Sequence, residues 1–523
     1  MNDGHLPGWG QSKLADLILK TLGGDWGKSP EEFLDGRDLV LVHVIRGTEV
    51  KFWQVDKGVT AARRALKVSS LTKRRLRAGD IIVEISGGGP SQPVARTILI
   101  DEEALERAEC PLVCSNFFRL VRLHPELNPT FAEAQLRFLY SKGAFNEFQT
   151  QTTNLRNLNF GRFVEDTEVL IAPLNEQHRI VAKLEKLLDK VDSCQKRLSK
   201  IPILLKRFRQ AVLAAACSGR LTADWREVNF SVETADELIT RTAQHRQTRF
   251  ALLNNKKRSV GNPKLTSIEN FKPKLKAERD LGVLPDTWAW VDLHFLMSPG
   301  EPFCYGVVQP GIDEPDGIPL VRAGDLNAGQ VSTFNLRRIP PSVDAQYPRS
   351  RLRGGELLVT VVGAGIGEAA IVQSECAGFN VARAVAKIPI REFSATFVYH
   401  WLCTTTAVGW MKGESREVAR PTLNLEQLQT ISVPLPPLAE QQEIVRRVDE
   451  LFSLANQIES RYPKAKQYVD SLKQSILAKA FRGELVPQDP NDEPATVLLE
   501  RIREARSTEP SKRLVKRTSK SEV

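Results

Sequence analysis

The sequence contains few cysteines and no long hydrophobic run. Its 523 residues include 7 cysteines, an odd number, and only Cys110 and Cys114 lie close together. No second cysteine or histidine pair completes a zinc site, so we expect reduced thiols and no bound metal. No apolar stretch approaches the ~20 residues of a membrane span, and the N-terminus has no signal-peptide pattern. We therefore expect a soluble, cytoplasmic protein with no membrane partner.

Catalytic motifs are also missing. Residues 363–367 form a glycine-rich loop after a strand-like run, but residues 368–372 read as another strand and not as a phosphate-binding helix, which favours a hairpin turn. Residues 27–29 resemble the end of a P-loop, but that motif requires a glycine at position 22, where this sequence has Leu22. We find no Asn/Asp-Pro-Pro-aromatic tetrad of amino-methyltransferases, no nuclease carboxylate–lysine cluster, no helicase motif set and no His-x₃-His pair. The sequence predicts a chain that has no catalytic residues and is not an enzyme.

Acidic residues are outnumbered by basic ones. The chain carries 73 Lys and Arg against 63 Asp and Glu, for a net charge of +10, while 41% hydrophobic residues are ordinary for a globular protein. Collagen-like and wholly disordered chains are excluded. The length predicts three or four domains at roughly 150 residues each. The basic excess favours a polyanionic partner such as nucleic acid.

The chain repeats itself. Residues 173–181 (Pro-Leu-Asn-Glu-Gln…Ile-Val) reappear as 437–445, and the match continues without a gap to Gly219-x-Leu221 and Gly483-x-Leu485. Upstream of each copy, Leu-Pro-Gly-Trp at 6–9 is matched by Leu-Pro-Asp-Thr-Trp at 284–288. Residues 75–83 are likewise matched by 351–359, and a glycine cluster follows both. The pattern indicates a variable region and a helical repeat, both present twice, in a molecule with pseudo-two-fold symmetry.

The helical repeats carry apolar residues at steps that alternate between four and three. A seam of this period is typical of a helix that pairs with another helix, so we expect the two repeats to form a coiled coil with each other. We expect Pro202 and Pro463 to cause kinks or short breaks, because proline removes a backbone donor. The predicted seam residues are Ile180, Leu184, Leu187 and Val191 in the first repeat and Ile444, Val448, Leu451 and Ile458 in the second.

The variable regions read as mixed α+β, each large enough for its own core. Residues 80–85 and 357–362 are strand-like, and residues 131–140 and 397–402 look helical. No acid occurs between Lys57 and Gly79. Lys and Arg neutralise phosphates, and Arg also binds guanine edges. The DNA-binding candidates are Arg63, Arg64, Lys67, Lys73, Arg74, Arg75 and Arg77 in the first region and Arg337, Arg338, Arg349, Arg351, Arg353, Lys412, Arg416 and Arg420 in the second.

These motifs resemble the specificity (S) subunit of type I restriction–modification systems, over about residues 6–506 and with each motif used twice. The resemblance implies an α+β fold with two α/β target recognition domains, separated by two long antiparallel coiled-coil helical repeats. The predicted domains are 1–172 (recognition domain 1), 173–283 (central repeat and basic linker), 284–436 (recognition domain 2) and 437–523 (C-terminal repeat and basic tail). The first half departs slightly, because Glu84 stands where the second half has Thr360.

The resemblance also implies function and partners. Each recognition domain would read one half of an asymmetric, interrupted site in double-stranded DNA, and the helical repeats would set the spacer. Two methyltransferase (M) subunits would dock on the repeats and supply S-adenosylmethionine and adenine-N6 transfer. Restriction (R) subunits would add ATP- and Mg-dependent translocation and cleavage, so this chain itself would hold no cofactor. Two alternatives stay open: the recognition half of a single-chain type II-like restriction–methylation system, and a coiled-coil adaptor that does not bind DNA.

Overall fold

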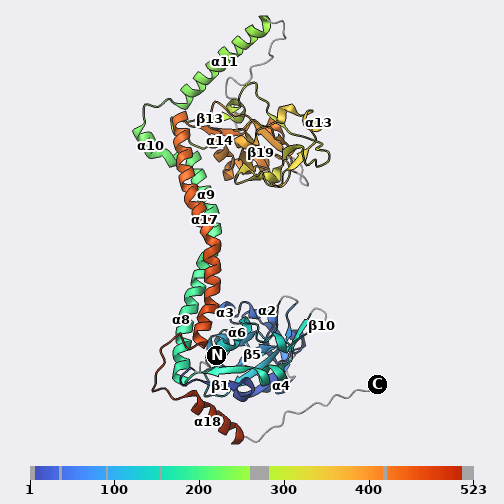
Figure 1. Ribbon diagram of the computed structural model, residues 1–523, viewed down its shortest axis with the longest axis vertical. Helices are drawn as coiled ribbons and strands as arrows, with labels where there is room; N and C mark the ends of the chain where they lie inside the picture. Colours follow the sequence, from blue (N-terminus) through green and yellow to red (C-terminus); the bar gives the residue numbers. More distant parts are fainter. Residues whose placement is uncertain are drawn as a thin grey trace, which may run out of the picture. The chain divides into compact units, whose positions relative to one another are not determined.

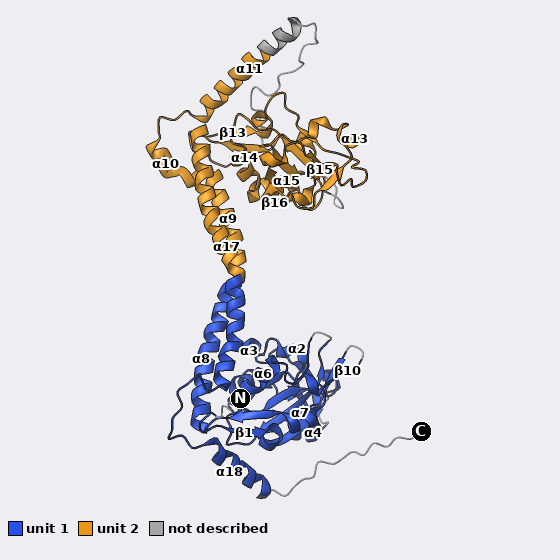
Figure 2. Cartoon of the chain, in the orientation of Figure 1, with its two compact units in different colours: residues 1–199, 464–523 blue, residues 200–463 orange. Residues whose placement is uncertain are grey.

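The computed structural model describes residues 6–33, 38–89, 92–152, 155–259, 282–415 and 421–508. The chain forms two compact units, coloured separately in Figure 2. One unit comprises residues 1–199 and 464–523, and the other comprises residues 200–463. Each unit thus joins one variable region to parts of both helical repeats. The basic linker at 260–281 and the tail after residue 508 lie outside the described residues.

The first variable region is built from antiparallel sheets with one parallel pairing. Its central four-stranded sheet has the order β2-β9-β5-β7, and a second sheet has the order β4-β3-β8, in which β3 and β8 are parallel. The first and last strands of the region, β1 and β12, pair with each other. The strands are β1 (Gly10–Lys13), β2 (Ile18–Gly23), β3 (Leu39–Ile45), β4 (Ala62–Lys67), β5 (Ile81–Glu84), β7 (Thr97–Leu99), β8 (Leu112–Cys114), β9 (Phe118–Leu123) and β12 (Glu168–Ile171).

The second variable region repeats this arrangement. Its main sheet has the order β14-β22-β19-β20-β17-β16, and the smaller sheet β18-β15-β21 again contains one parallel pair, β15 with β21. Strands β13 and β23 pair as β1 and β12 do. The strands are β13 (Ala289–Asp292), β14 (Cys304–Tyr305), β15 (Ile318–Val321), β16 (Leu326–Asn327), β17 (Gly329–Val331), β18 (Arg337–Ile339), β19 (Leu357–Thr360), β20 (Ala369–Ile371), β21 (Asn380–Val381), β22 (Val385–Ile388) and β23 (Ser432–Leu435).

The elements expected at the centre of each region are confirmed. β5 and β19 occupy the two strand-like runs, and all four residues of each are buried, as expected for short apolar strands covered on both faces. Residues 363–367 form the turn between the antiparallel strands β19 and β20, so this glycine-rich loop is a hairpin connection. The expected helices are α6 (Pro129–Ser141) and α14 (Ala395–Leu402), each begun by a side-chain N-cap, Asn128 or Ser394.

The helical repeats differ at their prolines. The first repeat consists of two helices, α8 (Leu174–Leu198) and α9 (Ile201–Cys217), and Pro202 lies in the first turn of α9, where no backbone donor is needed. The second repeat is a single helix, α17 (Leu438–Phe481), that passes through Pro463. We expected a kink or a short break at Pro463, and the structure shows no break there. One lost hydrogen bond does not end a helix that continues for many residues on both sides.

The repeats pair antiparallel within each unit (Figure 1). In the first unit, Ile180 and Leu184 near the start of α8 share a core cluster with Leu477 and Phe481 near the end of α17. Lys473 also forms an ion pair of 2.5 Å with Asp192 on α8. In the second unit, the end of α9 contributes Val212 and Ala216 to the same core as Ile444 and Val448 near the start of α17.

A shorter helix follows each repeat. In the second unit, α11 (Ala235–Ser259) packs on the second variable region, where Arg246 pairs with Glu392. In the first unit, α18 (Ala495–Thr508) packs on the first variable region through Leu498 and Ile502. The backbone N–H of Ala235, at the start of α11, donates to Thr287 O at 2.9 Å, and that of Ala495, at the start of α18, donates to Gly8 O at 2.8 Å. Thr287 and Gly8 each directly precede the repeated tryptophan. In each unit, the helix that follows the repeat is thus attached to the start of the variable region by an equivalent hydrogen bond.

Candidate nucleic-acid interface

The repeated Pro-Leu-x-Glu-Gln motif joins each variable region to its helix. In the second unit the carboxylate of Glu440 is 0% exposed and accepts hydrogen bonds from Trp288 Nε1 at 2.8 Å and Thr222 Oγ1 at 2.6 Å. Arg226 forms an ion pair with the same carboxylate. The acid at the start of α17 therefore holds the tryptophan that begins the variable region.

The first unit makes the same contact with fewer partners. Glu176 is 1% exposed and its Oε2 accepts from Trp9 Nε1 at 3.1 Å, whereas its Oε1 has no hydrogen-bond partner among the described residues. Burial raises the pKa of Glu176, and the hydrogen bond from Trp9 opposes that shift only in part. The two glutamates are equivalent in sequence and differ in their electrostatic surroundings.

The glutamine of the motif has one role in both units. Gln177 Nε2 donates to Ala172 O at 2.8 Å, and Gln177 Oε1 accepts from the backbone N–H of Asn128 at 3.1 Å. In the same way Gln441 Nε2 donates to Pro436 O, and its Oε1 accepts from the N–H of Ser394, both at 2.9 Å. Asn128 and Ser394 are the N-caps of α6 and α14. Sequence reasoning identified this motif but missed its role, although its identity in both copies was a signal.

The basic residues of the first variable region fall into two groups. Arg64 and Arg74 bind backbone carbonyls: Arg64 Nε donates to Trp26 O at 3.2 Å, and Arg74 Nε donates to Gly23 O at 3.0 Å. The other five are exposed and form no ion pair with a described residue, so their charge is available to an external anion. They are Arg63 and Lys67 on β4, Lys73 on α4 (Val68–Arg74), and Arg75 and Arg77 in the loop before β5.

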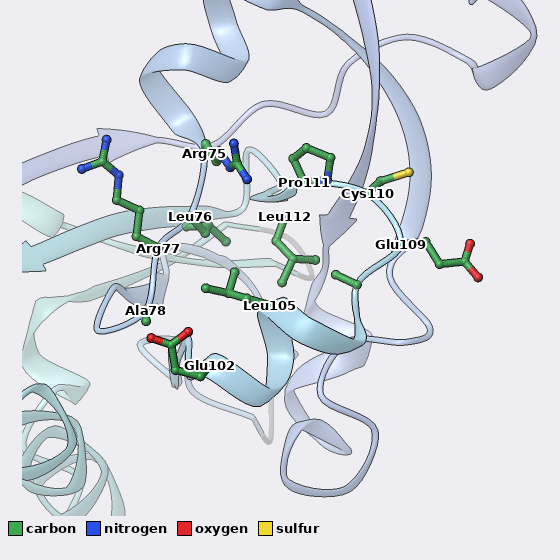
Figure 3. Close-up of a pocket in the computed structure, with 11 residues that line it drawn as sticks. Arg75, Leu76, Arg77, Ala78, Glu102, Leu105, Glu109, Cys110, Pro111 and Leu112 are labelled. Carbon is green, nitrogen blue, oxygen red and sulfur yellow. The ribbon is translucent and has the colours of Figure 1, made fainter.

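Arg75 and Arg77 also line a surface hollow of about 550 Å³. Its floor includes Leu105 of α5 (Glu102–Arg107), and Glu102 and Glu109 lie at its sides. Figure 3 shows the Arg77 guanidinium directed away from both carboxylates. The hollow contains acidic as well as basic side chains, so it is not a specific anion site. The exposed guanidinium groups of Arg75 and Arg77 are themselves able to bind an anion.

The second variable region places its basic residues on the equivalent elements. Arg337 and Arg338 lie on β18, the counterpart of β4, and both donate to loop carbonyls, Gly311 O and Gly317 O. Arg351 pairs with Asp344. Arg349, Arg353 and Lys412 are exposed. Arg416 and Arg420 lie outside the described residues.

The loop before β5 and the loop before β19 have the same construction. The backbone N–H of Arg77 donates to Asp80 Oδ2 at 2.7 Å, and that of Arg353 donates to Glu356 Oε1 at 2.8 Å. The glycine before each acid has a positive φ, +85° at Gly79 and +78° at Gly355, a conformation that favours glycine. The same turn thus presents one exposed arginine in each variable region.

The proposed seam residues are mostly covered. Ile180, Leu184, Val191, Ile444 and Val448 are buried. Leu187 and Leu451 are half-buried, while Ile458 is 49% exposed. The predicted seam is therefore covered at most of its positions and exposed at Ile458.

The described residues contain neither a cluster of metal ligands nor a membrane-spanning helix. Among residues 6–33, 38–89, 92–152, 155–259, 282–415 and 421–508, no three His, Cys, Asp or Glu side chains gather where they could hold a metal ion. Across the same part of the chain, no helix combines the length and the apolar character that crossing a bilayer would require.

Known proteins share both the sequence and the fold. The profile of the family described as "Type I restriction modification DNA specificity domain" matches residues 313–465. The type I restriction enzyme EcoBI specificity subunit of Escherichia coli is 38% identical over 374 residues, which cover 70% of this chain and 69% of that relative. The StySPI specificity subunit of Salmonella potsdam is 26% identical over 531 residues, covering 98% and 99% of the two chains.

Two solved structures have the same fold at low identity. The HsdS subunit from Thermoanaerobacter tengcongensis matches with a TM-score of 0.51 and 18% identity, over 92% of this chain and 100% of that one. A chain from a study of the assembly and conformational transition of the type I R-M system matches with a TM-score of 0.54 and 17% identity, over 92% and 99%. The repeated architecture, the repeated motifs and these matches agree, and the chain belongs to the family of type I restriction–modification specificity subunits.

Proposed function

We propose that this chain gives a type I restriction–modification complex its DNA sequence specificity, with each variable region reading one half of a bipartite, asymmetric site. The observation that carries the proposal is the duplication of one fold with exposed basic residues on equivalent elements. Arg77 and Arg353 stand on the same turn, and β4 and β18 both carry arginine. Two similar readers in one chain fit a target with two half-sites.

The partners follow from this role. Two methyltransferase subunits dock on the paired helical repeats and contribute S-adenosylmethionine and methyl transfer. Restriction subunits contribute ATP- and Mg-dependent cleavage. The chain itself acts as a non-catalytic, cytoplasmic subunit. The sequence contains no methyltransferase tetrad, nuclease cluster or helicase motif set, which supports this division of labour.

The test is to map N6-methyladenine in a host with and without the gene for this chain, in the presence of its methyltransferase partner. The expected result is one interrupted motif with two different halves, methylated only when the chain is present. Methylation that does not depend on the chain would overturn the proposal, as would methyl transfer by the purified chain alone.

The basic residues allow a second test. Replacing Arg77 by Ala removes one exposed charge, so binding of the assembled complex to DNA should weaken alike for all sequences if Arg77 contacts only phosphate. The slope of log K against log salt should then flatten by about one ion. The control is Lys183→Ala, which removes an exposed charge from another surface, on α8. Arg64→Ala is unsuitable as a control, because it would also remove the hydrogen bond from Arg64 to Trp26 O.

A further inference from the structure

A polar β-hairpin lies at the edge of the first variable region and contributes one side chain, Leu158, to its core. It consists of β10 (Gln149–Thr152) and β11 (Leu155–Leu158), which pair antiparallel, and β11 also pairs with the short strand β6 (Ser86–Gly87). Figure 1 shows β10 at the periphery of this region. Residues 153 and 154, between the strands, lie outside the described residues.

The composition of this hairpin is unusual for an exposed edge. Its described residues 148–152 and 155–159 contain four amides, two threonines and one arginine, and no acid. Exposed edge strands are ordinarily protected by charged side chains, lysine above all, or by proline. Amides, hydroxyls and arginine are instead the side chains that pair with base edges: arginine with guanine, and asparagine or glutamine with adenine.

The root of the hairpin is firmly held. Gln149 Oε1 accepts from the N–H of Val94 at 3.1 Å, and Gln149 Nε2 donates to Val94 O at 3.0 Å. The N–H of Leu158 donates to Ile85 O at 2.8 Å, and its side chain is buried in the core. Ser86 Oγ contacts Asn157 Oδ1 at 2.7 Å. These contacts fix the root of the hairpin before any DNA is bound, which lowers the entropic cost of binding.

Beyond this root the polar side chains are accessible. Gln151 stands directly opposite Arg156, and Thr150 stands opposite Asn157. Gln151 and Thr150 are exposed, and neither side chain makes a hydrogen bond to a described residue. Leu155 is 47% exposed on the same hairpin, and an apolar group of this kind suits the methyl group of thymine. A complete, unengaged amide at Gln151 offers one donor and one acceptor, the pair that the major-groove edge of adenine requires.

We propose that the β10–β11 hairpin enters the major groove and reads bases of one half-site, with Gln151 contacting an adenine. The proposal rests on the DNA-reading function given above and adds the element and the residue. The major groove, ~12 Å wide, admits a two-stranded ribbon, whose strands lie about 4.8 Å apart. No acid occurs among the described residues 148–152 and 155–159, so these strands carry no charge that the phosphates on either side would repel.

The equivalent segment of the second variable region lies at the same place in the fold. Thr422 forms a bridge to Val362, which occupies the position of Ser86 in the repeat. The proposal is confined to the first region, because residues 416–420 lie outside the described residues.

The experiment uses the full chain assembled with its methyltransferase subunits and a DNA library randomised over both half-sites. With Gln151→Ala, discrimination at one A·T position of one half-site should fall by about 5- to 150-fold, while all other positions keep their preference. The matched control is Gln346→Ala, which removes an exposed amide on the second variable region. Gln346→Ala should leave base discrimination unchanged in the half-site that Gln151→Ala affects.

The outcomes separate the two proposals. A uniform loss of affinity for all sequences in Gln151→Ala would mean contact with the phosphates and would overturn base reading by this residue. Unchanged preferences in Gln151→Ala and in a Thr150→Ala/Gln151→Ala double variant would overturn the role of the hairpin, with the reading function intact. A wild-type complex without any sequence preference would overturn the function itself. Circular dichroism of each variant checks that it is folded.

Discussion

At the scale of single residues, the repeated glutamate stands in two different electrostatic settings. Glu440 is paired with Arg226 and accepts two further hydrogen bonds, whereas Glu176 holds only Trp9 and has one buried oxygen without a partner among the described residues. A buried carboxylate is stable when it is paired and costly when it is not. Identical substitutions should therefore have different effects.

We expect Glu440→Gln to destabilise the chain by about 1–3 kcal/mol, because it leaves the partly buried Arg226 without its counter-charge. Glu176→Gln should change the free energy of unfolding by less than about 1 kcal/mol, since it removes a poorly paired buried charge and keeps an acceptor for Trp9. Urea unfolding of the two variants measures both effects. Equal losses in both would show that Arg226 contributes nothing to the difference.

His400 on α14 predicts a dependence of stability on pH. It is 3% exposed, neither ring nitrogen has a hydrogen-bond partner among the described residues, and burial lowers its pKa to about 4. The unfolded chain, with a histidine pKa of ~6.5, therefore binds a proton between pH 6.5 and 4 that the folded chain does not. Stability should fall as the pH decreases through this window, by about 2–3 kcal/mol near pH 4 from this residue.

The matching variant is His400→Leu, which keeps a similar volume beside Phe452. It should retain stability at pH 7.5 and lose the part of the pH dependence between 6.5 and 4 that His400 contributes. Unfolding midpoints measured across this range test it. The idea fails if wild type and variant lose stability in parallel.

At the scale of elements, the paired helices depend on a small number of buried side chains. Val448 of α17 is fully buried in the same core as Val212 and Ala216 of α9. We expect Val448→Asp to cost about 3 kcal/mol or more, because it places an unpaired charge in an apolar core. Gln457→Asp, an exposed position on the same helix, should stay within about 0.5 kcal/mol of wild type. A folded Val448→Asp chain with an unchanged urea midpoint would contradict this packing.

The elements were predictable where one periodicity dominates. β5, β19 and the helical repeats are encoded by short apolar runs or by a seam with a 3.5-residue period, and such signals are local. The behaviour at Pro463 was not predictable, because the cost of one proline competes with packing along a helix of 44 residues. The roles of Arg64 and Arg74 were also hidden. Sequence shows that they are basic, but not that nearby carbonyls engage them.

The contacts of the repeated motif belong to a second class that the sequence alone could not reveal. The motif pairs Glu176 with Trp9 and Gln177 with Asn128, residues far apart in the chain. A repeat shows that a residue is used twice without showing its partner. The β10–β11 hairpin could not be predicted as a reading element for a related reason. Its amides form no periodic pattern, and its exposure follows only from the packing of the core beneath it.

At the scale of the whole molecule, duplication predicts independent readers. The second variable region has its own core, its own copy of the motif contacts and its own covering helix α11. Exchanging residues 284–436 for the corresponding region of a relative should therefore change one half of the methylated motif and leave the other half intact. Mapping of N6-methyladenine in the host gives the answer. If both halves change together, the two regions do not read independently.

The helical repeats make a further prediction about the spacer between the half-sites. Helix α17 runs without interruption from Leu438 to Phe481, and it pairs first with α9 and then with α8. Seven residues inserted both after Lys200 and after Tyr462 add two helical turns to each repeat and keep the seam in register. If the inserted residues are helical, each insertion lengthens its repeat by about 10 Å, close to three base pairs at ~3.4 Å each. We expect the methylated motif to keep both halves and to gain about three base pairs of spacer. An insertion in α17 alone should displace one seam against the other and prevent assembly. If the chain with longer repeats methylates a motif whose spacer is unchanged, the helices do not set the spacing.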